Sequence, residues 1–104
     1  MRVAAFSLLF CIGIMGPDSA RAVDQYELAE SRGCLACHQL DVKVVGPPFK
    51  KISRMYKGDE TAESRLVDKV VKGGVGVWGT MPMHAGNVTS EDASILVKWI
   101  LGMS

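Results

Sequence analysis

Two cysteines and a histidine lie within five residues of one another, in the segment Cys34-Leu35-Ala36-Cys37-His38. The pattern C-x-x-C-H is typical of the covalent attachment of a c-type haem. The two thiols can add to the two vinyl groups of a porphyrin, and the histidine that follows at once can bind the iron as its proximal ligand. The segment therefore predicts one covalent haem c, with Cys34 and Cys37 binding the porphyrin and His38 binding the metal.

Two other kinds of site contain a C-x-x-C pair. A thioredoxin-like redox pair belongs to a βαβ unit, and no such pattern surrounds Cys34. A structural zinc site needs two more cysteine or histidine ligands at a matching spacing, but the rest of the chain supplies only Cys11 and His84. Haem attachment is therefore the favoured interpretation, with the disulfide and the metal site as its alternatives.

The first 22 residues have the pattern of a secretory signal peptide. Arg2 supplies a positive charge, residues 3–15 are apolar and uncharged, and Ala20-Arg21-Ala22 has small residues at the two positions that a signal peptidase reads. The apolar run is shorter than the roughly 20 residues that a membrane-spanning helix needs. We therefore predict a signal peptide over residues 1–22, a domain over residues 23–104, location in the periplasm and no stable membrane insertion.

The predicted domain is small and nearly neutral. Loss of Arg2, Arg21 and Asp18 leaves ten basic and ten acidic residues, from totals of 12 and 11 in the whole chain. There is no basic stripe of the kind that nucleic-acid binding requires. A chain this short buries little apolar surface by itself and usually needs an additional stabilising element, such as a covalent cofactor. A covalent haem would be such an element. We expect the domain to be a monomer.

Four helices are indicated by apolar residues spaced three or four apart and by their end signals. The first covers residues 24–32 and stops at Gly33, and the second runs from the turn at 46–48 to Gly58. The third starts near Asp59 or Thr61 and ends at Gly73-Gly74, a typical helix stop. No segment alternates like a strand, so the fold class is all-α.

The fourth predicted helix begins at Thr89. Asp92 follows three residues later, which is typical of a capping box. The apolar face of this helix is predicted to be Ile95, Leu96, Trp99 and Ile100.

A glycine-rich segment, residues 73–88, separates the third and fourth predicted helices and is too long for a simple turn. Loops of this length are often functional. The segment contains Met81 and Met83 on either side of Pro82. A thioether is a soft ligand that favours ferrous iron, and neither methionine belongs to an apolar stripe that would make it a core residue. The residue types alone leave both methionines as candidates for the second axial ligand.

Together these motifs resemble those of the small bacterial class I cytochromes c of the c551/c552 type, which are periplasmic electron carriers. The resemblance extends from about Asp24 to the C-terminus. The family has a compact all-α cytochrome c fold of about four helices around a covalently attached haem. The matching segments are Gly33-Cys34-x-x-Cys37-His38, Val45-Gly46-Pro47, Gly76-Val77-Trp78-Gly79, Met81-Pro82-Met83 and Lys98-Trp99-Ile100-Leu101.

The resemblance implies roles for four more residues. Met83 falls at the axial methionine, and Pro47 falls where a backbone carbonyl accepts a hydrogen bond from the proximal histidine. Trp78 falls where an indole N–H reaches a haem propionate. Lys69 stands where many members have an arginine that pairs with a propionate; a lysine keeps the charge but not the bidentate fork. A packed aromatic and a solvated helix charge are the alternatives for Trp78 and Lys69.

The chain departs from the family pattern after Met83. Many members continue with prolines and an amide side chain that can hydrogen-bond the methionine sulfur, whereas this chain continues His84-Ala85-Gly86-Asn87. Asn87 is the one amide in this run. The departure bears on the orientation of the methionine and on the reduction potential. His84 is expected at the surface, with iron ligation as its alternative.

The expected function is electron transfer and not enzymatic catalysis. Electrons would pass one at a time at an exposed haem edge surrounded by small uncharged residues such as Val45, Gly76 and Val77. Partners would be transient redox proteins, such as a periplasmic reductase, an oxidase or a membrane cytochrome complex, docking through a small interface. The alternatives are a haem-based sensor or peroxidase-like enzyme with an open or labile distal site, and a detachable haem subunit of a larger oxidoreductase.

Overall fold

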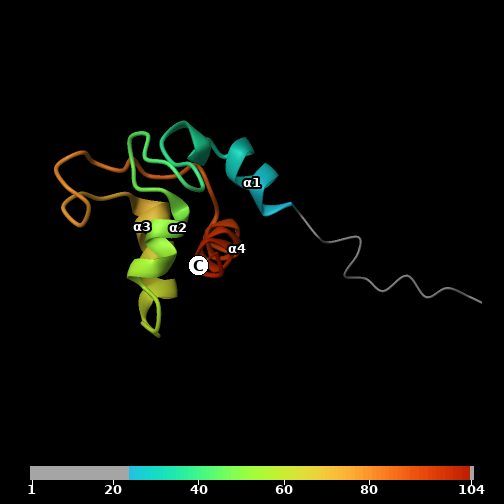
Figure 1. Cartoon of the computed structure of the whole chain (residues 1–104). Coiled ribbons are helices and arrows are strands. Elements are labelled where there is room, and N and C mark those ends of the chain that lie inside the picture. The colour runs from blue at the N-terminus through green and yellow to red at the C-terminus, as the bar shows by residue number, and fades with distance from the viewer. Residues whose placement is uncertain (1–23, 104) are drawn as a thin grey trace, which may run out of the picture.

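The computed structural model describes residues 24–103, which form four α-helices and one short 3-10 helix (Figure 1). Within this range there are two isolated β-bridges and no strand, so the predicted all-α fold is confirmed. The predicted signal peptide lies outside the described residues. Among residues 24–103, no helix has both the length and the hydropathy needed to cross a bilayer. The elements are α1 (Gln25–Ser31), η1 (Cys34–Ala36), α2 (Phe49–Met55), α3 (Ala62–Lys72) and α4 (Ser90–Leu101).

The helix ends follow the local signals in the sequence. The Asp24 carboxylate accepts a hydrogen bond from the Tyr26 N–H at the start of α1, over 3.0 Å. The Thr89 hydroxyl oxygen accepts one from the Asp92 N–H at the start of α4, over 3.1 Å. Such caps satisfy backbone donors that have no partner within the helix. Gly73 closes α3 with φ of 76°, a conformation that favours glycine.

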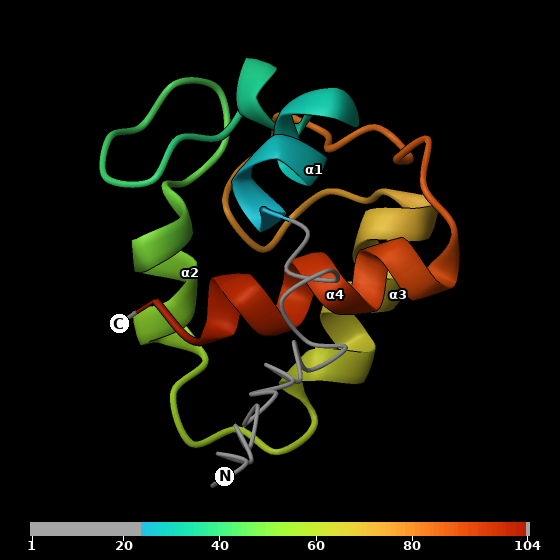
Figure 2. The same ribbon diagram turned by 90° about the vertical axis from the view of Figure 1, so that its right-hand side faces the viewer.

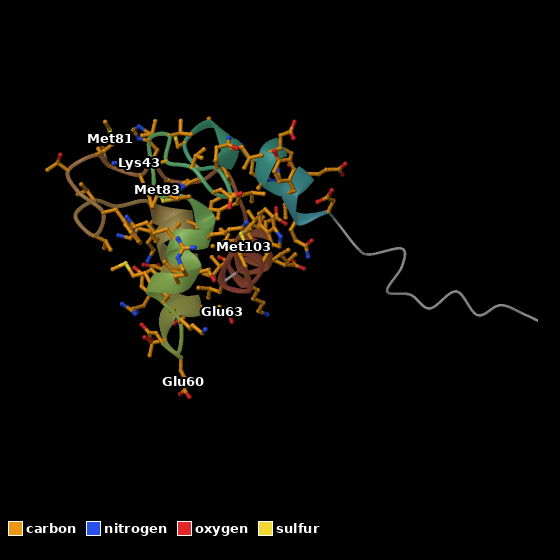
Figure 3. All side chains as sticks on the ribbon, viewed as in Figure 1. Lys43, Glu60, Glu63, Met81, Met83 and Met103 are labelled. Atoms are coloured by element: carbon orange, nitrogen blue, oxygen red, sulfur yellow. The ribbon has the colours of Figure 1, made fainter. Side chains whose placement is uncertain are left out.

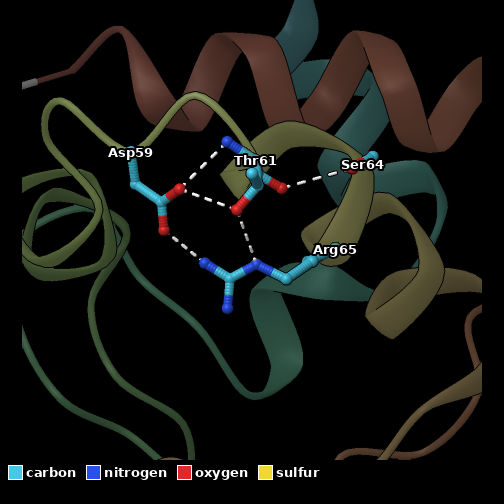
Figure 4. A network of polar contacts seen from close by, with 4 residues as sticks. All are labelled: Asp59, Thr61, Ser64 and Arg65. Carbon is cyan, nitrogen blue, oxygen red and sulfur yellow. Dashed lines mark hydrogen bonds and ion pairs between the residues drawn. The ribbon is translucent and has the colours of Figure 1, made fainter.

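The turn between α2 and α3 is closed by Asp59 (Figure 4). Its carboxylate accepts hydrogen bonds from the Thr61 hydroxyl, over 2.8 Å, and from the Thr61 N–H, over 2.9 Å, and it pairs with Arg65. The Thr61 bonds stabilise the charged form and are the main cause of a lowered pKa at Asp59, with a smaller contribution from Arg65. This network links the turn to the first turn of α3, which contains Arg65.

α4 is the central helix, because it contacts α1, α2 and α3 (Figure 2). The buried apolar side chains are few, and most are small or come from α4 itself. The core of the described residues consists of Ala29, Phe49, Ala62, Ala93, Leu96, Val97 and Ile100.

One part of the predicted α4 face is wrong. Ile95 is 36% exposed, whereas Ala93 and Val97 are buried. The buried positions 93, 96, 97 and 100 follow the i, i+3, i+4, i+7 spacing of a single helical stripe. Residue 95 lies off this stripe, so its side chain remains outside the core.

Candidate haem site

Two loops lie at one end of the helices and border a single large cavity (Figure 1). The first loop follows η1 and leads to α2. The second joins α3 to α4 and is called here the methionine loop, residues 73–89. The cavity has a volume of about 720 Å³, within the range of roughly 300–1,000 Å³ that is usual for small-molecule and cofactor sites. It is lined by all seven of the predicted site residues, Cys34, Cys37, His38, Pro47, Lys69, Trp78 and Met83.

The His38 imidazole is held by a backbone acceptor and by an aromatic ring. Its Nδ1–H donates a hydrogen bond to the Pro47 carbonyl oxygen over 2.8 Å. Because a carbonyl oxygen can only accept, Nδ1 carries the hydrogen and Nε2 keeps its lone pair. The ring also stacks on Phe49, with centroids 5.3 Å apart and planes inclined by 21°. His38 is therefore oriented with Nε2 available to a metal.

Gly46 leaves the space that this orientation needs. A Cβ atom at residue 46 would lie 2.8 Å from the His38 Nδ1 atom, too close for any side chain. The N–H groups of Val45 and Gly46 both donate to the Cys37 carbonyl oxygen, over 3.2 and 2.7 Å, and so bring the loop back against the histidine. Sequence analysis included Gly46 in the Val45-Gly46-Pro47 segment but assigned it no role. Its position directly before Pro47 was the one signal that could have indicated its closeness to His38.

The two cysteines are presented by a tight turn. The N–H groups of Cys37 and His38 donate to the Cys34 carbonyl oxygen over 3.3 and 2.9 Å. Both thiols are free; Cys34 is partly buried and Cys37 is exposed. Burial raises the pKa of the Cys34 thiol, so this group stays protonated and uncharged at neutral pH. Both sulfur-bearing side chains border the same cavity as His38.

Met83 is held through its backbone. Its N–H and C=O exchange hydrogen bonds with Gly74 over 2.8 and 2.9 Å. A Cβ atom on Gly73 would lie 2.5 Å from the Met83 carbonyl oxygen, so the base of the methionine loop needs glycine there. Met83 is partly buried, whereas Met81 is 68% exposed and lies at the outer rim (Figure 3). His84 is exposed, as expected, although it also borders the cavity.

Lys69 and Trp78 border the cavity from α3 and from the methionine loop. The Lys69 ammonium lies close to Gly74, so a Cβ at residue 74 would displace the end of this lysine side chain. The Trp78 ring is 37% exposed, and the Lys51 Nζ atom lies 5.6 Å from its centroid. Sequence reasoning missed Lys51, because no local pattern links a lysine in α2 to a tryptophan in a distant loop.

Three of the five cations without an ionic partner in the described residues border the cavity, namely Lys43, Lys51 and Lys69. Among the ten lysines and arginines of residues 24–103, five form ion pairs with carboxylates. The other five belong to α2, to the segments that flank it, or to the wall of the cavity. They are Lys43, Lys51, Arg54, Lys57 and Lys69.

These features fit a covalently attached haem. Two thiols on one turn can hold the porphyrin, and an oriented imidazole with a free Nε2 borders the same space as a thioether. Apolar side chains supply much of the remaining wall and suit a flat aromatic plate. They include Phe49, Leu66, Val70, Leu96, Val97 and Ile100.

Comparisons with known proteins agree with this chemistry. The family model described as cytochrome c matches residues 22–104. Cytochrome c2 of Rhodocyclus tenuis is 47% identical over 85 residues, which cover 77% of this chain and 92% of that protein. Cytochrome c-552 of Hydrogenobacter thermophilus is 40% identical over 98 residues, which cover 94% and 96%. The crystal structure of wild-type Nitrosomonas europaea cytochrome c552 matches with a TM-score of 0.73 and 41% identity, covering 76% of this chain and 99% of that one.

Proposed function

Because the chain belongs to the cytochrome c family, as a small class I member of the c551/c552 type with one covalent c-type haem, we propose that it carries single electrons in the periplasm through a haem bound by His38 and Met83. The coarser function, haem-based electron transfer, follows from the family itself. One observation carries the finer proposal. A single cavity brings the attachment motif together with Met83, and the bond from His38 to Pro47 leaves Nε2 free for the iron.

Each site residue has a defined task in this proposal. The haem, when bound, supplies one-electron chemistry at its iron. Cys34 and Cys37 hold the porphyrin in place, and Pro47 keeps the imidazole of His38 oriented and raises its basicity. Met83 supplies a thioether that favours the reduced state. Because both side chains stay in place in each oxidation state, little needs to rearrange during transfer.

Lys69 and Trp78 are proposed to face the haem propionates. Support comes from their place on the cavity wall and from the absence of a carboxylate partner for Lys69 within the described residues. A lysine ammonium and an indole N–H are both donors that suit a carboxylate. Lysine gives a point charge and not the two-pronged contact of an arginine.

Partners are proposed to dock at the mouth of the cavity. Val45, Val77, Trp78 and Met81 are exposed there, and such an apolar patch suits a brief, small interface. Lys43 and Lys51 border the same cavity without an ionic partner in the described residues, and they favour a partner whose docking surface is acidic. A periplasmic reductase, an oxidase or a membrane cytochrome complex would fit, with this chain acting as a monomeric carrier and not as an enzyme.

Processing is part of the proposal. Ala20-Arg21-Ala22 and the single C-x-x-C-H segment predict a mature protein of residues 23–104 with one haem. Intact mass spectrometry of the periplasmic protein should give the mass of that polypeptide plus one haem. A mass that retains residues 1–22 would show that export leaves the leader attached.

The axial ligand is tested by three alanine variants of the holoprotein. Met83→Ala should abolish the charge-transfer absorption band of methionine-bound ferric haem, lower the reduction potential and admit small exogenous ligands. Met81→Ala and His84→Ala should keep the band, because Met81 is exposed at the rim and His84 is a surface residue. If the band survives all three substitutions or is absent from the parent protein, methionine ligation is wrong and the sensor or peroxidase-like function takes its place.

A further inference from the structure

The tip of the methionine loop, residues 75–82, has little holding it. Every residue in this stretch is exposed. A pair of backbone hydrogen bonds between Gly74 and Met83 closes the base of the tip, and a bond from the Gly86 N–H to the Val70 carbonyl oxygen ties the loop to α3. Within the tip there is one backbone bond, from the Gly76 N–H to the Gly79 carbonyl oxygen over 3.2 Å. The backbone alone therefore leaves the tip free to move relative to the helices.

One cation–π contact joins this tip to a helix in the described part of the chain. The Lys51 ammonium of α2 lies 5.6 Å from the centroid of the Trp78 ring. Lys51 and Trp78 both border the cavity, so the contact spans its mouth. Gly76 and Gly79 flank the tryptophan with φ of 107° and 123°. The backbone beside Trp78 is therefore permissive, and the ring depends on its own contacts for its position.

The neighbouring lysine shows that the contact is specific to residue 51. Lys50 pairs with Asp41 over 2.7 Å and does not border the cavity. Lys51 has no ionic partner among the described residues, so its ammonium is available to the aromatic face. An exposed cation–π contact shifts an equilibrium by roughly two- to fivefold.

We propose that Lys51 is a positioning residue that holds Trp78, and with it the tip of the methionine loop, closed over the mouth of the cavity. This inference rests on the proposed function, in which the same loop supplies Met83 to the iron. When the tip is closed, water and small ligands reach the Met83 side of the site slowly. When the contact is removed, the tip opens more often and access becomes faster.

The test measures the rate at which imidazole binds to the ferric holoprotein. Lys51→Met removes the charge but keeps an unbranched side chain, and it should raise the rate roughly two- to fivefold. Lys51→Arg keeps a cation that can lie on the ring, and it should restore the parental rate. Lys50→Met is the matched control, because it makes the same change of charge one residue away, and it should leave the rate unchanged.

A double-variant cycle ties the effect to the tryptophan. In a Trp78→Leu background, Lys51→Met should no longer change the rate, since the aromatic partner is already gone. The methionine charge-transfer band should remain in every Lys50 and Lys51 variant, which shows that the iron ligands are intact. The proposal is overturned if Lys51→Met behaves like its parent, if Lys50→Met accelerates binding equally, or if arginine does not rescue.

The same data separate the two proposals. If the parent protein lacks the methionine band and binds imidazole as an open site does, methionine ligation fails and the role of Lys51 fails with it. If the parent has the band and binds slowly, but Lys51→Met is no faster, the proposed function stands and the positioning role alone is wrong.

Discussion

His38 and Met83 border the same cavity but are held by different means. The imidazole of His38 is bonded at Nδ1 to Pro47 over 2.8 Å and stacked on Phe49, which itself meets Trp99 edge to face at 5.8 Å. The attachment side is thus connected by side chains to the packed core. Met83 is positioned by a backbone pair with Gly74, at the base of a loop whose tip is exposed.

This difference predicts that changes on the two sides alter different properties of the protein. A change on the attachment side disturbs groups that are packed against α2 and α4, so it should cost folding free energy. A change in the methionine loop can be absorbed by movement of an exposed segment. It should therefore alter ligand access and reduction potential more than it alters the stability of the fold.

The largest expected effect comes from removing the covalent link altogether. Cys34→Ala combined with Cys37→Ala should leave a largely unfolded chain, because a cavity of about 720 Å³ occupies the place where a small core would otherwise close. Circular dichroism should show little helix and no cooperative thermal transition. A cooperative, fully helical apoprotein would show that the helices need no haem. The attachment side would then not determine the stability of the fold.

Gly46→Ala probes the attachment side. Its Cβ would lie 2.8 Å from the His38 Nδ1 atom, and the ring is held by both Pro47 and Phe49. We expect a loss of about 2–3 kcal/mol of unfolding free energy, typical of overpacking at a rigid contact. Gly102→Ala is the control, because its new atom would meet only ordinary contacts at 3.5 Å and beyond. Equal losses in chemical denaturation would contradict the rigid attachment side.

Gly73→Ala probes the methionine loop. The substitution imposes a φ of 76° on alanine and a contact of 2.5 Å with the Met83 carbonyl oxygen. The backbone strain should cost about 1–2 kcal/mol, while displacement of Met83 should weaken the charge-transfer band. Gly58→Ala is the matched control, with φ of 79° and no atom within 4 Å of the new Cβ. If both variants weaken the band equally, the Gly73 contact does not position Met83.

The smallest effect is expected far from both sides, at the turn before α3. The pKa of Asp59 is lowered chiefly by its bonds from Thr61, so its stabilising contribution is present above the unfolded pKa of about 4 and is lost as pH falls through the lower folded value. Asp59→Asn should therefore unfold at a slightly lower temperature than its parent at pH 6, and the difference should shrink below pH 4. Glu60→Gln, which removes a carboxylate from the same turn, is the control. A constant difference at every pH would contradict the linkage.

The sequence by itself determined the features that depend on short spacings. The attachment motif, the caps at Asp24 and Thr89 and the stop at Gly73 involve residues a few positions apart, where backbone geometry dictates which groups can meet. The order of the longer motifs added the family and its fold. Processing, the periplasmic location and the roles of Lys69, Trp78 and Met83 stay predictions for the experiments above.

The tertiary structure decided which distant side chains meet. The contact of Gly46 with His38, the pairing of Lys51 with Trp78 and the exposure of Ile95 follow from the directions in which loops and helices pack. It also separated Met83, partly buried, from Met81, which points outward at the rim although both flank the same proline. The physical reason is that burial and long-range contact depend on the whole packing arrangement, whereas local spacing reports only on neighbours along the chain.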